Sequence, residues 1–184
     1  MRELVKLTLE EHRQVVEKMA ALEGEIASAG ELCGNALAQG QRIYLCGNGG
    51  SAAELIGRFV NDRRALPAIA LTTDTSALTA IGNDYGYDEV FSRQVEGLCR
   101  EGDILIAIST SGNSGNVLNA VDAAHRAGAS VIGLSGKSGG ELNAKCDVSL
   151  VVPSDVTARI QEMHIVIGHL LCALVEEYLG LGTD

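Results

Sequence analysis

Five short apolar runs alternate along this chain with longer stretches of helical periodicity. The runs cover residues 42–46, 68–71, 103–108, 130–134 and 147–152. Strands that are apolar on both faces are typical of a parallel sheet with helices on either side. The pattern therefore predicts an α/β fold, a three-layer sandwich in which a five-stranded parallel sheet is flanked by helices.

Helical periodicity predicts more helix than such a sheet needs. Residues 4–26 are expected to form one helix, and Ser28 with Glu31 has the spacing of a capping box that begins a second, ending at Gly40. The other predicted helices cover 76–81, 88–98, 117–127 and 156–179. We expect a single domain over 1–184, with helices in 1–40 that pack on the core and on neighbouring subunits.

Composition narrows the classes of partner. The net charge is −10, so there is no basic excess for nucleic acid or an anionic membrane surface. No secretory signal is recognisable, and the apolar stretch 165–175 is shorter than a membrane span. Five cysteines at scattered spacings are expected to be reduced, mostly buried thiols. We expect a cytoplasmic protein with a small-molecule ligand.

A polar loop directly follows the strand at 103–108. Ser109, Ser111 and Ser114, with Thr110, offer hydroxyl groups at the start of a helix. Backbone N–H groups and the helix dipole make such a place suitable for a phosphate monoester, although the loop lacks the lysine of a P-loop. The alternative is that the serines and Asn113 merely cap the helix.

A glycine loop directly follows the first strand. The residues Gly47 to Ser51 match only part of a dinucleotide-binding pattern, because position 52 is Ala and no acidic residue ends the next strand. Close approach of the backbone to a sugar phosphate is the better use of these glycines, and a plain tight turn is the alternative.

Four motifs in order carry a family resemblance. They are CGNGGS at 46–51, GND at 82–84, STSGNS at 109–114 and RIQEMH at 159–164. Over about residues 4–179 the chain resembles the sugar isomerase (SIS) domain family, and more narrowly its branch that acts on sedoheptulose 7-phosphate in bacterial heptose synthesis. The resemblance implies a homotetrameric aldose–ketose isomerase that forms D-glycero-D-manno-heptose 7-phosphate through an enediol, without a nucleotide.

The resemblance also implies roles for particular residues. Glu54 matches the family's catalytic base and His169 its partner acid/base, which suits the transfer of protons between adjacent carbons and between oxygens. One zinc ion per subunit is implied, with Glu54, Gln161 and His169 among its ligands. The positions that match substrate-binding residues are Asn48, Gly49, Gly50, Ser51, Asn83, Asp84, Ser109, Thr110, Ser111, Ser114 and Gln161.

The chain departs from the family pattern before Glu54. The family has a zinc-binding His four residues earlier, where this sequence has Gly50, and only 15 residues separate Ser51 from Pro67. The segment is about seven residues short, close to two helical turns. Either the helix is truly shorter, or the sequence lacks a stretch that the protein has. An alternative function is a non-catalytic SIS protein, such as a replication-initiator-associating factor or a sugar-phosphate sensor.

Gln161 and His169 are separated by eight positions on one predicted helix. That spacing corresponds to roughly 12 Å along the axis, too far for both to bind one ion easily from the same helix. We therefore predict a site at a subunit interface, with His169 acting across it. His164, about 140° around the helix from His169, is expected to point elsewhere.

Overall fold

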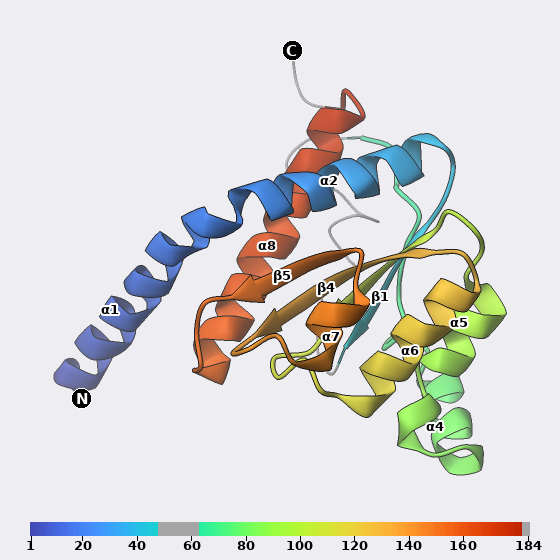
Figure 1. Cartoon of the computed structure of the whole chain (residues 1–184), viewed down its shortest axis with the longest axis horizontal. Helices are drawn as coiled ribbons and strands as arrows, with labels where there is room; N and C mark the ends of the chain where they lie inside the picture. Colours follow the sequence, from blue (N-terminus) through green and yellow to red (C-terminus); the bar gives the residue numbers. More distant parts are fainter. Residues whose placement is uncertain (48–62, 182–184) are drawn as a thin grey trace.

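A single parallel sheet of five strands forms the centre of the computed structural model, which describes residues 1–47 and 63–181 (Figure 1). The spatial order is β2-β1-β3-β4-β5, and every neighbouring pair is parallel. The strands are β1 (Ile43–Gly47), β2 (Ala68–Ala70), β3 (Ile104–Ile108), β4 (Ser130–Gly136) and β5 (Val148–Val152). The predicted sheet is confirmed.

Helices cover both faces of this sheet. The α-helices are α1 (Arg2–Lys18), α2 (Glu23–Ala38), α4 (Thr75–Asp84), α5 (Ser92–Leu98), α6 (Gly115–Arg126), α7 (Gly140–Lys145) and α8 (Thr157–Tyr178). Two short 3-10 helices, η1 (Met19–Leu22) and η2 (Tyr87–Glu89), join neighbouring elements. The helix predicted after the first glycine loop lies outside the described residues.

Successive side chains of each strand enter two separate cores. On β1, Ile43 belongs to the core under α2 and α8, whereas Tyr44 belongs to the core under α5, α6 and α7. On β3, Ile104 and Leu105 divide in the same way. The alternation is that of a strand with period two, and it confirms the predicted three-layer sandwich.

The beginning of the chain differs from the prediction. The expected single helix over 4–26 is interrupted by η1, and α2 starts at Glu23 rather than at Ser28. The Ser28 hydroxyl donates to the carbonyl of Gly24 at 3.0 Å, so it bonds back along the helix instead of capping it. The capping-box prediction is therefore wrong, because Ser can bond to the preceding turn as well as to the following one. Similarly, Asp88 lies within η2, and α5 begins only at Ser92.

Two glycines bring α2 and α8 into close contact. A Cβ added at Gly30 would lie 2.7 Å from a carbon of Leu174, and one at Gly34 would lie 2.5 Å from the ring of Tyr178. Residues four apart share one face of a helix, so these positions form a flat strip against α8. The strip holds α8 against the rest of the layer.

The helix α1 extends beyond the body of the molecule (Figure 1). Of its residues only Val15 is buried. The helix is tied to α8 by three polar contacts: Arg159 Nη1 donates to the carbonyl of Thr8 at 2.8 Å and lies 3.9 Å from Glu11 Oε2, and His12 Nδ1 lies 2.7 Å from Glu162 Oε2. The apolar residues that α1 exposes are Leu4, Val5, Leu7, Leu9 and Val16.

Among the described helices, α8 alone has the length and apolar composition of a membrane span. Its 22 residues include a window of which 44% is buried inside the protein. Ile160, Met163 and Ile167 are buried in the core under α2 and α8. These contacts explain the apolar composition as that of a core helix.

A buried ion pair joins α8 to the chain just before β2. Arg63 Nε donates to Glu176 Oε1 at 2.8 Å, and the two side chains are only 1% and 3% exposed. Removing one member of such a pair leaves the other charge buried. We predict that Glu176→Ala lowers the free energy of unfolding by about 3 kcal/mol in urea titrations.

A matched control is the exposed pair of Arg126 and Glu96, whose nitrogen and oxygen lie 3.0 Å apart. Glu96→Ala is expected to leave the urea midpoint nearly unchanged, since exposed ion pairs contribute little. Equal losses in the two variants would contradict the role assigned to burial.

Candidate functional site

The carboxyl ends of β1 and β3 stand side by side at one edge of the sheet. Gly47, the last residue of β1, is the register partner of Ile108, the last residue of β3. The predicted glycine loop starts directly after Gly47, and the serine loop starts directly after Ile108. Ligands of open α/β sheets bind beyond this edge. Asn48, Gly49, Gly50, Ser51 and Glu54 themselves lie outside the described residues.

The serine loop, residues 109–114, is anchored at both of its ends. The N–H of Ser109 donates to the carbonyl of Leu134 at 3.0 Å, and the Ser109 and Ser114 hydroxyl oxygens lie 2.8 Å apart. Ser114 is the N-cap residue of α6, but its side chain makes no capping hydrogen bond. The simple capping interpretation therefore fails for Ser114. The loop is closed upon itself in front of the helix N-terminus.

The helix α7 holds the serine loop from outside. The carbonyl of Gly112 accepts from the N–H of Leu142, and Asn113 Oδ1 accepts from the N–H of Glu141, both at 3.0 Å. Gly112 has a φ of +70°, and a Cβ there would lie 1.9 Å from the carbonyl oxygen of Gly139. Only glycine fits this contact. Sequence reasoning missed α7, although the Gly139–Gly140 pair signalled a tight approach.

Asn83 and Asp84 close the end of α4 and are exposed. Asn83 Nδ2 donates to Asp84 Oδ1 at 2.8 Å. A few residues later, the Asp88 carboxylate lies 3.2 Å from where a Cβ of Gly115 would stand, at the start of α6. The segment that follows Asp84 thus packs against the same helix end that carries the serine loop.

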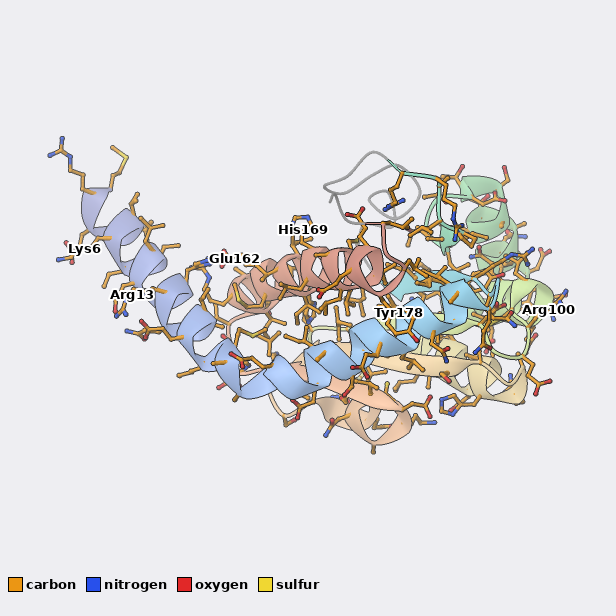
Figure 2. All side chains as sticks on the ribbon, turned by 90° about the horizontal axis from the view of Figure 1, so that it is seen from above. Lys6, Arg13, Arg100, Glu162, His169 and Tyr178 are labelled. Carbon is orange, nitrogen blue, oxygen red and sulfur yellow. The ribbon has the colours of Figure 1, made fainter. Side chains whose placement is uncertain are left out.

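The candidate residues of α8 lie on its exposed side. Gln161 and His169 are both exposed, and Figure 2 shows the His169 side chain standing out from α8 on the side away from α2. The apolar residues Ile165, Val166 and Leu170, exposed by 48%, 40% and 42%, share this surface. The predicted action of His169 across a subunit interface remains a prediction.

The other histidine of α8 lies in the protein interior rather than on its surface. His164 is buried, and its Nε2 lies 3.0 Å from the carbonyl oxygen of Ser135. Burial lowers the pKa of this imidazole, because desolvation disfavours the charged form. The prediction that His164 points away from His169 is confirmed.

Of the three predicted zinc ligands, the structure describes Gln161 and His169, whereas Glu54 lies outside the described residues. Outside residues 48–62 and 182–184, no group of three or more His, Cys, Asp or Glu side chains is placed to hold a metal. Gln161 and His169 stand eight residues apart on one helix, roughly 12 Å along its axis.

The cysteines match the expectation of free, mostly buried thiols. All five are free, and four are buried. Burial raises the pKa of Cys46, which lies in β1 at the ligand edge, to about 12. This thiol stays uncharged at neutral pH, so it is not a nucleophile of the site.

A family model described as the SIS domain matches residues 9–136. The chain belongs to the SIS domain family, as its motifs indicate. Among curated proteins, the phosphoheptose isomerase of Nitratiruptor sp. is 55% identical over 96% of this chain and 99% of its own length. Phosphoheptose isomerase 1 of Campylobacter jejuni is also 55% identical, over 95% and 97%. Within the SIS domain family, the chain belongs with the phosphoheptose isomerases.

Solved structures agree in fold. Phosphoheptose isomerase GmhA from Neisseria gonorrhoeae is 46% identical, with a TM-score of 0.89 over 96% of this chain and 98% of that chain. The enzyme of the same name from Francisella tularensis is 40% identical, with a TM-score of 0.90 over 95% and 97%. A putative phosphosugar isomerase from Bacteroides fragilis, 18% identical with a TM-score of 0.63, shares the fold alone.

The buried His164 makes stability depend on pH. In the unfolded chain its pKa returns to about 6.5, so the unfolded state binds a proton before the folded state does. Neutral His164 therefore makes its full contribution to the free energy of unfolding above this pH. That contribution is lost as the pH falls towards the pKa of His164 in the folded state. We predict that the free energy of unfolding falls less steeply between pH 7 and 5 in His164→Gln, measured by urea titration. Parallel curves for the two proteins would refute this source of the pH dependence.

Proposed function

We propose that this protein is an aldose–ketose isomerase that converts sedoheptulose 7-phosphate to D-glycero-D-manno-heptose 7-phosphate, a precursor in bacterial heptose and lipopolysaccharide synthesis. The observation that carries the proposal is the serine loop, closed by the Ser109–Ser114 contact of 2.8 Å in front of α6. The named relatives at 55% identity over nearly their whole length support the choice of substrate.

The serine loop suits the phosphate end of the sugar. Thr110, Ser111 and Ser114 can offer hydroxyl donors, and α6, with 12 residues, directs the positive end of its dipole towards the loop. The cradle is neutral, so the anion is held by hydrogen bonds and by the helix rather than by an ion pair. Asn83, Asp84 and Gln161, with residues 48–51, are proposed to bind the remainder of the sugar.

Isomerisation requires two proton movements. A proton leaves the hydroxymethyl carbon C1 and returns on the neighbouring carbonyl carbon C2, which gives an enediol in between. In the proposal, the Glu54 carboxylate carries this proton between the carbons, because one base can face both. His169 moves a proton between the two oxygens, which suits an imidazole at neutral pH.

The absent histidine before Glu54 favours a second candidate, a sugar-phosphate-binding protein without catalysis. In that case the serine loop would still bind the phosphate, but turnover would be lost. Zinc content is a further difference between the two candidate functions, because this sequence lacks one of the family's zinc ligands, the histidine before Glu54. A zinc ion held by Glu54, Gln161 and His169 remains part of the proposal, and metal analysis of the purified protein tests it independently of activity.

Sedoheptulose 7-phosphate turnover tests the proposal directly. Incubation with and without added zinc should yield the aldose, measured by chromatography of the products. Glu54→Gln should lower kcat by at least about a thousandfold with little change in affinity, since only the proton carrier is lost. Ser111→Ala should instead raise KM by about fivefold, because one donor to the phosphate is removed.

Two results would contradict parts of the proposal. Binding of the sugar phosphate by the wild-type protein without turnover, in either metal condition, would favour the non-catalytic alternative. Retained turnover in Glu54→Gln would refute the assignment of the base.

We further propose a homotetramer in the cytoplasm. The exposed apolar residues of α1 and the Ile165–Val166–Leu170 surface of α8 offer area that neighbouring subunits can bury. Five free thiols fit a reducing compartment.

The assembly depends in this proposal on the apolar side chains of α1. Leu7, 53% exposed, is a suitable position to test. Leu7→Glu is expected to shift the mass measured by light scattering from four subunits to fewer, because a charge cannot be buried without a partner. Gln39→Glu, which adds the same charge at an exposed polar position directly after α2, should leave the mass unchanged. A monomeric wild-type protein would refute the assembly.

A further inference from the structure

The shape of the serine loop depends on a side chain that the resemblance assigns no role. Asn113 lies inside the loop but is exposed, between Gly112 and Ser114. Its side chain does not cap α6, the helix that follows it. It reaches instead towards α7, an element about 28 residues further along the chain.

Asn113 makes hydrogen bonds in two directions. Towards the loop, its N–H donates to the Ser111 hydroxyl oxygen and its Nδ2 donates to the Ser111 carbonyl, both at 3.2 Å. Towards α7, its Oδ1 accepts from the N–H of Glu141 at 3.0 Å. One amide side chain thus connects a proposed phosphate donor to the first turn of a separate helix.

The backbone around Asn113 leaves little room for movement. The carbonyl of Gly112 accepts from the N–H of Leu142 at 3.0 Å. A Cβ added at Gly140 would lie 2.6 Å from the Ser111 carbonyl oxygen and 2.7 Å from Asn113 Oδ1. The loop and the start of α7 are therefore in direct contact, with glycine required at the point of closest approach.

We propose that Asn113 is a positioning residue for the phosphate-binding loop. Its backbone N–H holds the Ser111 hydroxyl, and its side-chain amide holds the Ser111 carbonyl. The same amide links the loop to α7. This inference rests on the proposed function, because it takes the serine loop as the phosphate site. Asn113 itself touches neither the sugar nor the reacting carbons in this account.

The expected effect follows from where the phosphate lies in the substrate. The phosphate is on C7, whereas the chemistry occurs at C1 and C2, so a poorly held loop weakens the substrate complex and the transition state equally. Such a loss raises KM and leaves kcat largely unchanged. A merely structural role would lower the melting temperature without this selective effect on KM.

The test compares Asn113→Ala with Asn119→Ala. Asn119 is the matched control, because its Nδ2 also makes two hydrogen bonds, to the Asp88 carbonyl and to Glu89 Oε1, away from the serine loop. Asn113→Ala should raise KM for sedoheptulose 7-phosphate about tenfold with kcat within about twofold, since roughly two hydrogen bonds that order the loop are lost. Asn119→Ala should change KM less than about twofold.

Asn113→Asp provides a second variant that keeps the acceptor for Glu141 and so preserves the link to α7. Its added negative charge should repel the phosphate, and salt screens that repulsion. Relative to wild type in the same buffer, the KM of Asn113→Asp should recover as salt is raised, whereas that of Asn113→Ala should stay high. An Asn113→Ala protein with the wild-type KM would overturn the inference while leaving the proposed function intact.

Binding of inorganic phosphate, measured by calorimetry, distinguishes a failure of the proposed function from a failure of the inference about Asn113. Should the wild-type protein bind phosphate but not turn the sugar over, the proposed function fails, and weaker phosphate binding by Asn113→Ala would still support the inference. Absence of phosphate binding by the wild-type protein would overturn the inference, whereas turnover of sedoheptulose 7-phosphate decides the proposed function.

Discussion

The parallel pairing of β1 with β3 is the constraint on which the rest of the site depends. Because Gly47 and Ile108 end the two strands in register, the two polar loops predicted from sequence begin at neighbouring points. The pairing of β3 with β4 then brings the turn at Gly139 beside Gly112. The carboxyl ends of β1, β3 and β4 therefore lie along the same edge of the sheet. Residues more than sixty positions apart are brought together by backbone hydrogen bonds alone.

Much of this arrangement could be predicted from the sequence. The strands are short and apolar on both faces, so their number and their parallel direction followed from a pattern that few other folds share. The position of the serine loop between β3 and α6 was also recognised. Local patterns failed where two local options compete: Ser28 bonds to the preceding turn, and Asp88 joins a 3-10 helix instead of starting the helix predicted over 88–98.

The helix α7 shows a different limit of sequence reasoning. Its six residues are too few for a periodic pattern to be visible, and its stability comes from contacts with a distant loop. Leu142 is fully buried under β4, and the N–H groups of Glu141 and Leu142 are accepted by that loop. No local feature indicates that Asn113, which follows a serine cluster, would bond to this helix rather than to its own.

The base of α1 lies on the same turn of α8 as one of the proposed sugar contacts. Arg159 binds the Thr8 carbonyl and the Glu162 carboxylate, and Gln161 directly precedes Glu162 in the chain. In the proposed assembly, α1 contacts neighbouring subunits while its base is held beside a proposed sugar contact on α8. A change at the far end of α1 that suits a new neighbour would then also move the backbone that carries this side chain, so assembly and substrate preference would not drift independently in this architecture.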